Sequence, residues 1–208
     1  MAKVLYIQAS ATKDRSKSIE VSDAFVEAYK KANPSDTVET VNIFDIDLPE
    51  FNAMMAQAKY RILHGQDHTA EEKEAWGKVE KAIEHFKSAD KYVFAIPMWN
   101  FGIPWRLKQY IDIIVQPGYT FAVNEQGSQG LLIDKSVVAI YARGGQYGPG
   151  TGGEALDMQS NYFEMVLGFM GITQVHTVFV EPTMVDKETV EKAIAEAKQK
   201  AVELAGRF

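Results

Sequence analysis

Cysteine is absent from all 208 residues of the chain, and that absence excludes several kinds of site. Disulfide frameworks, thiolate catalysis and zinc sites built on thiolates all require it. The chain also has no apolar run of membrane-spanning length, and no basic and apolar leader precedes the first strand-like run at Lys3. We therefore expect a cytoplasmic protein without a membrane partner.

A strong charge of either sign is also absent. The chain has 22 Lys and Arg residues against 28 Asp and Glu, a formal net charge of -6. Nucleic-acid binding is not favoured, because affinity for a phosphate backbone comes mainly from clustered basic residues. Hydrophobic residues make up 46% of the chain, as in ordinary globular proteins. The length suits one α/β domain over residues 1–208.

Five apolar runs have the length and flanking residues of strands. Tyr92–Ile96 is unbroken, as is typical of a central parallel strand that helices cover on both faces. The expected strands are Lys3–Gln8, Thr37–Ile43, Tyr92–Ile96, Val137–Ala142 and Val175–Val180.

Apolar residues at helical spacing follow each expected strand. Thr69 and Glu72 have the spacing of a capping box, and Asp186 can cap the last helix. The five apolar stripes are Val21, Phe25, Ala28, Tyr29 and Ala32; Trp76, Val79, Ile83 and Phe86; Leu107, Tyr110, Ile111 and Ile114; Leu156, Phe163, Val166, Leu167 and Met170; and Val190, Ile194, Ala197, Ala201 and Leu204.

Alternating strands and helices predict a five-stranded parallel sheet with helices on both faces and right-handed crossovers. Two segments interrupt the alternation: Asp45–His68, irregular and with at most a short helix, and Tyr119–Asp134. In such sheets a ligand binds beyond the carboxyl ends of the strands. That rule selects a first loop, Ala9–Ser18, a second loop, Pro97–Phe101, and a third loop, Ala142–Gln146.

The first loop is rich in hydroxyl and basic side chains and leads directly into a helix. Its amides and hydroxyls suit a phosphate, and the helix dipole adds roughly 0.3 to 1 kcal/mol for an anion. It lacks both G-x-G-x-x-G and G-x-x-x-x-G-K-[ST], which disfavours a dinucleotide cradle and an NTPase. The alternative is that its serines only cap the helix.

The second and third loops have the composition of a binding site for a flat ring. Trp99, Asn100 and Phe101 combine planar apolar surface with an amide, which suits a heteroaromatic ring, although the two aromatic residues can instead pack on the core. Gly144 and Gly145 leave backbone amides open to a ring carbonyl. Arg143 assists them or forms a surface salt bridge.

Together these segments resemble those of FMN-dependent NADH-azoreductases over nearly the whole chain. The most specific part is the P-M-[YW]-N-F loop followed one strand later by R-G-G. The matching segments are Ser10, Ser16-Lys17-Ser18, Pro97-Met98-Trp99-Asn100-Phe101, Gly118-x-Thr120-Phe121 and Ala142-Arg143-Gly144-Gly145.

The resemblance implies a flavodoxin-like fold, tightly but non-covalently bound FMN, and a homodimer with its active site near the interface. Ser10, Ser16, Lys17 and Ser18 then bind the FMN phosphate. Pro97–Phe101 flanks the ring, Ala142–Gly145 contacts its pyrimidine side, and Phe121 covers the substrate.

The implied activity is a ping-pong transfer of hydride from NADH or NADPH through the flavin to azo compounds or quinones. No catalytic protein side chain is required, since the cofactor carries the chemistry, and Tyr147 is a possible source of protons. A non-enzymatic flavin electron carrier and a regulatory domain with a degraded site are the alternatives. A metal site at His64 and His68 has little support, because no third ligand lies nearby in sequence.

Overall fold

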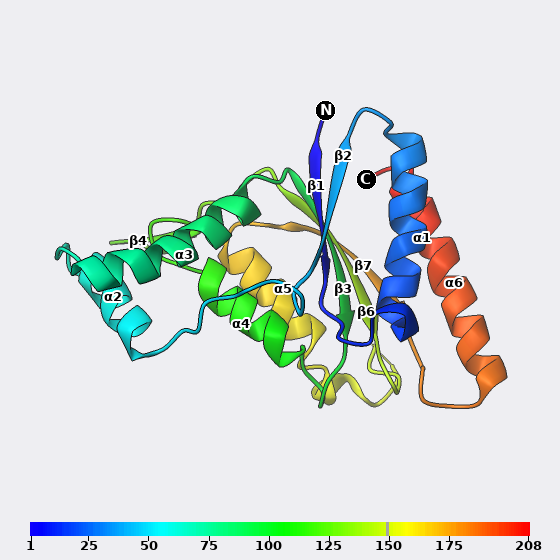
Figure 1. The fold of residues 1–208 in the computed structure, drawn as a ribbon. Coiled ribbons are helices and arrows are strands. Elements are labelled where there is room, and N and C mark those ends of the chain that lie inside the picture. Colours follow the sequence, from blue (N-terminus) through cyan, green and yellow to red (C-terminus); the bar gives the residue numbers. More distant parts are fainter. Residues whose placement is uncertain (149) are drawn as a thin grey trace.

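The computed structural model describes residues 1–148 and 150–208, and in it five parallel strands form one twisted sheet in the order β2-β1-β3-β6-β7 (Figure 1). The sheet and its parallel pairing confirm the fold expected from the sequence. The strands are β1 (Lys3–Gln8), β2 (Thr37–Asn42), β3 (Lys91–Pro97), β6 (Ser136–Ala142) and β7 (Gln174–Val180).

Helices cover both faces of the sheet. Two of them, α1 (Lys17–Ala32) and α6 (Lys187–Ala205), lie side by side on one face (Figure 1). The other face is covered by α3 (Ala70–Lys87), α4 (Trp105–Ile114) and α5 (Ser160–Phe169). No helix among the described residues is long and apolar enough to cross a membrane.

The sheet separates two apolar cores because successive side chains of a strand point to opposite faces. In β1, Val4 and Tyr6 pack toward α1 and α6, whereas Leu5 and Ile7 pack toward α3, α4 and α5. All four are buried, as the unbroken apolar run of this strand indicates.

Capping residues fix where the helices begin. The expected capping box of α3 is present, with the Thr69 hydroxyl accepting from the Glu72 amide at 3.2 Å and the Glu72 carboxylate accepting from the Thr69 amide at 2.8 Å. Asp186 caps α6 as expected, accepting from the Thr189 amide at 2.9 Å.

Residues 45–68 are more regular than the sequence suggests. They contain α2 (Ala53–Leu63), an 11-residue helix that packs on α3 and is capped by Asn52. Only Met55 and Ala58 of α2 are buried, so the helix has almost no apolar stripe to signal it.

The expected start of the fourth helical stripe is wrong at Leu156. This residue ends a short 3₁₀ turn and is 48% exposed, and α5 begins only at Ser160. The reason lies in Asp157, whose Oδ1 accepts from the amides of Gln159 and Ser160 at 3.1 and 2.9 Å and so starts the helix three residues later.

Residues 119–134 form a hairpin of β4 (Phe121–Asn124) and β5 (Gly127–Gly130) beside the sheet. Its end touches the turn between α5 and β7, where Gly130 and Gly171 meet backbone to backbone. A Cβ atom on Gly130 would lie 2.2 Å from the Gly171 nitrogen. Gly171 itself has a φ of +97°, a conformation that favours glycine.

Two glycine substitutions should therefore change stability in opposite directions. Gly130→Ala forces the hairpin away from Gly171 and should lower the free energy of unfolding by about 1 to 3 kcal/mol, as overpacking does. Gly77→Ala lies within α3, where nothing is within 4 Å of the added Cβ, and should raise it by about 0.5 to 1 kcal/mol. Urea titrations of both variants measure the signs, and a stable Gly130→Ala protein would contradict this packing.

Candidate functional site

Three loops leave the sheet side by side because β1, β3 and β6 are neighbours in it. The Ala9 amide donates to the Ala95 carbonyl at 2.9 Å, and the Met98 amide donates to the Ala142 carbonyl at 2.8 Å. The strand order reverses direction along the chain at β1 and β3, which is where flavodoxin-type sheets place a ligand. The structure thus brings the first, second and third loops together at the carboxyl ends of the strands.

Buried hydroxyl groups line the end of the first loop. Ser16 caps α1, its hydroxyl accepting from the Ile19 amide at 3.4 Å, and it also contacts the Ser18 hydroxyl at 3.0 Å. The Ser10 hydroxyl lies 3.2 Å from that of Thr12. In the described part of the chain, the amides of Lys17 and Ser18 donate no hydrogen bond. Capping and anion binding are thus compatible here, since both use the first turn of α1.

The Lys17 side chain, by contrast, is partly exposed and forms an ion pair along α1. Its Nζ lies 3.3 Å from Glu20, which also pairs with Lys198 at 2.9 Å. Partial burial tends to raise the pKa of Glu20, but the contacts with both lysines outweigh it and lower that pKa. The Lys17 ammonium therefore lies next to α1 without filling the space in front of its first turn.

The second loop is a two-residue turn in a strained conformation. Trp99 and Gly102 exchange two backbone hydrogen bonds of 3.0 Å, and the residues between them, Asn100 and Phe101, have φ of +48° and +69°. Positive φ at both central positions is the geometry of a type I′ turn, which costs energy for a residue other than glycine. Such strain is characteristic of functional sites.

This turn holds two aromatic rings partly open to solvent. Trp99 is 37% exposed and Phe101 is 46% exposed, so core packing does not account for them. Trp99 has one aromatic neighbour, Phe44, at a ring distance of 6.0 Å. Sequence reasoning missed Phe44. Its position two residues after the end of β2 could have indicated it, because the three loops also follow the carboxyl ends of strands.

The third loop has two amides that the fold leaves open. The Arg143 carbonyl accepts from the Thr183 amide at 2.9 Å, and the Gly144 carbonyl accepts from the Met184 amide at 3.1 Å. In a trans peptide the N–H points away from the C=O, so the amides of Gly144 and Gly145 face away from residues 183 and 184. A Cβ on Gly144 would lie 2.8 Å from the sulfur of the exposed Met184 side chain, so a larger residue there would require that side chain to move.

Tyr147 joins the third loop to the second. Its ring meets that of Phe101 edge to face at 6.2 Å, and its hydroxyl would lie 3.3 Å from a Cβ on Gly145. Tyr147 therefore lies beside Phe101 and Gly145, and its role as a source of protons stays a prediction.

Two other residues of the third loop have their side chains turned away. Ala142 packs in the core toward α1 and α6. The Arg143 side chain is fully buried beneath the loop, with its guanidinium 2.8 Å from Asp157 and 3.4 Å from Glu181. Arg143 thus forms ion pairs, as one alternative expected, but in the interior instead of at the surface.

Phe121 does not meet the three loops within the chain. Its ring lies 4.6 Å from that of Phe169, the last residue of α5, next to the strand beginnings. The three loops lie at the opposite, carboxyl ends of the strands. The ten residues of α4 run between these two ends and span about 15 Å at 1.5 Å per residue. One copy of the chain therefore does not place Phe121 over its own loops.

The surface between the second loop and Phe121 is largely apolar. One hollow of about 570 Å³ lies beside the second loop, and another of about 410 Å³ reaches Phe121. Tyr162 lines both, so they form one continuous surface, here called the α4–α5 face. Its exposed side chains are mostly apolar, although the ion pair of Lys108 and Asp112 lies among them. The apolar ones include Phe51, Trp99, Trp105, Phe121, Met158, Tyr162, Met165 and Phe169.

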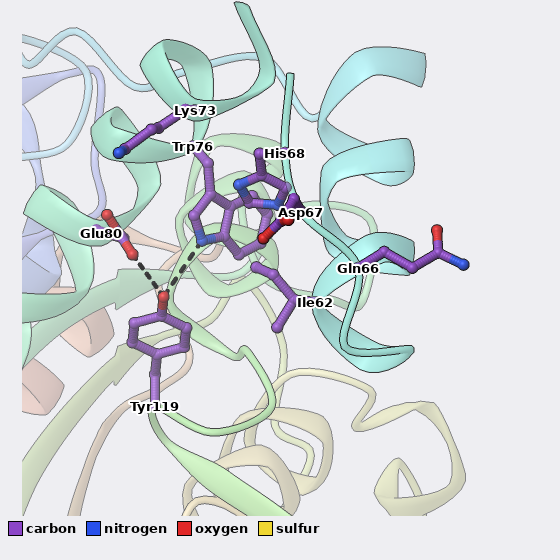
Figure 2. A pocket seen from close by; sticks show the side chains of 8 residues that line it. All are labelled: Ile62, Gln66, Asp67, His68, Lys73, Trp76, Glu80 and Tyr119. Carbon is purple, nitrogen blue, oxygen red and sulfur yellow. Dashed lines mark hydrogen bonds between the residues drawn. The ribbon is translucent and has the colours of Figure 1, made fainter. Parts of the chain in front are cut away.

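His64 and His68 are occupied by other contacts. The His64 ring stacks on Tyr60 at 3.9 Å and lies 2.8 Å from that residue's carbonyl, and His68 lies 2.9 Å from the Ala58 carbonyl. His68 lines a cavity of about 460 Å³ (Figure 2). Within the described residues, no three side chains of His, Asp or Glu are grouped so as to hold a metal ion.

A tyrosine closes one side of that cavity. The Tyr119 hydroxyl donates to Glu80 at 2.6 Å and accepts from the Trp76 indole at 3.4 Å (Figure 2). Partial burial and the Glu80 carboxylate raise the pKa of Tyr119. These contacts attach the segment before β4 to α3, away from the three loops.

Comparison with known proteins places this geometry in a family. A family model described as a flavodoxin-like fold matches residues 2–205. The FMN-dependent NADH:quinone oxidoreductase of Nitratidesulfovibrio vulgaris is 47% identical over 100% of both chains, and that of Desulfotalea psychrophila is 46% identical over 99% of this chain and 97% of its own.

Solved structures agree with the sequence relatives. An azoreductase from Bacillus anthracis superposes with a TM-score of 0.91 at 33% identity, covering 100% of both chains. A second, an FMN-dependent NADH-azoreductase of that species in complex with FMN, gives 0.86 at 31% identity, over 99% of this chain and 100% of the other. The chain therefore belongs to the flavodoxin-like family of FMN-dependent quinone reductases and azoreductases.

The positive φ of Phe101 should reverse the usual order of stability between alanine and glycine variants at this position. Phe101→Ala keeps a Cβ in the left-handed region, whereas Phe101→Gly removes it. The glycine variant should therefore be the more stable of the two by about 1 to 2 kcal/mol. Elsewhere in a folded chain alanine is normally the more stabilising residue. Urea titration compares the variants, and a more stable alanine variant would show that residue 101 does not hold a positive φ.

Proposed function

We propose that this chain, folded as one domain over residues 1–208, is an FMN-dependent oxidoreductase that passes electrons from NADH or NADPH to quinones and azo compounds. The observation that carries the proposal is the meeting of three loops at one sheet edge. They supply open amides at a helix start, exposed flat rings and a pair of glycine amides. The names of the relatives support the cofactor, the donor and both classes of acceptor.

The donor groups of the three loops fit the parts of FMN. We assign the phosphate to Ser10, Ser16, Lys17 and Ser18, where buried hydroxyls and the first turn of α1 favour an anion. Pro97, Met98, Trp99, Asn100 and Phe101 flank the ring. The Gly144 and Gly145 amides face its pyrimidine side, and Ala142 and Arg143 support them from below.

When bound, FMN would accept a hydride and pass two electrons on to the acceptor. The protein's own residues bind and orient the reactants, so no side-chain nucleophile is needed. The rings of Phe101 and Tyr147 meet edge to face, so a flat reactant would stack beside them, and we assign the Tyr147 hydroxyl as a proton source. We infer a ping-pong order, in which the donor leaves before the acceptor enters the same space.

We further propose a homodimer that buries the α4–α5 face. Large exposed apolar side chains gather on this face from the second loop to Phe121, and such a gathering marks interaction surfaces. A two-fold partner packed on it can bring its own Phe121 to these loops, which one chain cannot do. Since NADH and NADPH are cytoplasmic reductants, we also propose a cytoplasmic location.

The proposed activity is tested by steady turnover. The purified protein given FMN should oxidise NADH or NADPH continuously when a quinone or an azo dye is present, with parallel lines in double-reciprocal plots. A flavin electron carrier would bind FMN without turnover, and a degraded site would not bind it. Intersecting lines would contradict the ping-pong order alone.

The phosphate assignment is tested separately, by comparing the binding of FMN with that of riboflavin. Wild-type protein should prefer FMN to riboflavin, and Ser16→Ala should reduce that preference about tenfold, as expected for a lost hydrogen bond to a charged group. Asp186→Ala removes the comparable cap of α6 and should leave the preference unchanged. Equal effects of both variants would mean that Ser16 acts only as a cap.

The homodimer is tested on the α4–α5 face. Met165→Glu places a charge on exposed apolar surface of α5 and should shift the protein from dimer to monomer in light scattering after size-exclusion chromatography. Val202→Glu makes the same change on the exposed side of α6 and should remain dimeric. A dimeric Met165→Glu protein at low micromolar concentration would place the interface elsewhere.

A further inference from the structure

A fully buried guanidinium lies under the third loop, and each of its nitrogen atoms has a partner. Arg143 donates from Nε to Gln159 at 3.0 Å, from one terminal nitrogen to Asp157 at 2.8 Å and from the other to Glu181 at 3.4 Å. The ring of Phe179 lies 4.0 Å from the guanidinium carbon. A buried charge is costly unless it is paired and hydrogen-bonded, so this arrangement is specific and not incidental.

Gln159 connects this guanidinium to the second loop. Its Oε1 accepts from Arg143, and its Nε2 donates at 3.1 Å to the carbonyl of Ile96, which directly precedes Pro97. The side chain is fully buried. The amide both accepts and donates, which neither an ionised carboxylate nor an apolar side chain can do.

Arg143 also reaches the far end of the third loop. Its partner Glu181 accepts from the amide of Tyr147 at 3.3 Å. The base of the second loop, the start of the third loop and Tyr147 are therefore joined through one guanidinium. Buried side chains therefore connect the two loops in addition to the pairing of β3 with β6.

We propose that Gln159, held by Arg143, is a positioning residue for the bound flavin. It sets the spacing between the Met98–Phe101 turn and the Gly144 and Gly145 amides, and thereby favours the reduced ring, which carries more negative charge toward those amides. Fixed donors of this kind stabilise charge because they need no reorganisation. The inference rests on the proposed FMN site and concerns side chains that do not touch the cofactor.

Gln159→Met tests the bridge because it keeps the length of the side chain and removes both hydrogen bonds. Oxidised FMN should bind with little change, measured by fluorescence titration. Reduced FMN should bind about tenfold more weakly, which lowers the midpoint potential of the bound flavin by about 30 mV. The potential is measured by equilibration with a reference dye and requires no turnover.

Asn161 offers matched controls on the same helix. It is exposed and donates at 2.8 Å to the Asp157 carbonyl, and among the described residues its side chain forms no hydrogen bond to either loop. Asn161→Met should leave the potential unchanged. If Gln159→Met does not fold, Gln159→Glu keeps an acceptor for Arg143 but cannot donate to Ile96, and it should lower the potential further than Asn161→Asp, which adds the same charge.

The outcomes separate the two proposals. Wild-type protein that binds FMN, together with Gln159 variants whose potential moves no more than that of the Asn161 controls, overturns the positioning role and leaves the proposed function standing. Wild-type protein that does not bind FMN overturns both.

Discussion

Parallel pairing of β1, β3 and β6 is the constraint on which the remainder of the structure depends. Because these strands are neighbours and run the same way, the chain segments that follow them must leave the sheet together, although they lie about 90 and 45 residues apart in sequence. Burial on both faces holds the pairing in register. The apolar core therefore determines the site indirectly, by fixing where three polar and aromatic loops begin.

Most of this arrangement is readable from the sequence because it follows from periodicity. Unbroken apolar runs mark strands covered on both faces, and the Thr69 and Glu72 pair marks the start of α3. The pattern fails where burial is slight. Only two residues of α2 are buried, so its sequence carries no stripe, and Leu156 has helical spacing but precedes the Asp157 cap that starts α5.

The site itself is less readable, since several of its features depend on contacts distant in sequence. The residue types of the three loops indicate a phosphate and a flat ring, but not the left-handed conformation of Phe101 or the backing of Trp99 by Phe44. Arg143 in a loop reads as a surface residue. Its burial requires ion pairs with Asp157 and Glu181, which lie 14 and 38 positions away. No local sequence pattern predicts that these three residues meet.

These contacts also show how the protein maintains the strained turn of the second loop. A turn with two residues at positive φ persists only if its surroundings determine it more strongly than local preference does. Here the β3 to β6 pairing holds the turn at Met98, and Gln159 holds it at Ile96. Arg143 contacts both Gln159 and Glu181, and Glu181 accepts from the Tyr147 amide, so one buried guanidinium links the second loop to Tyr147. Loops at the ends of strands are ordinarily more mobile than the elements they connect, so buried ion pairs beneath them are a means of holding the proposed site in one arrangement.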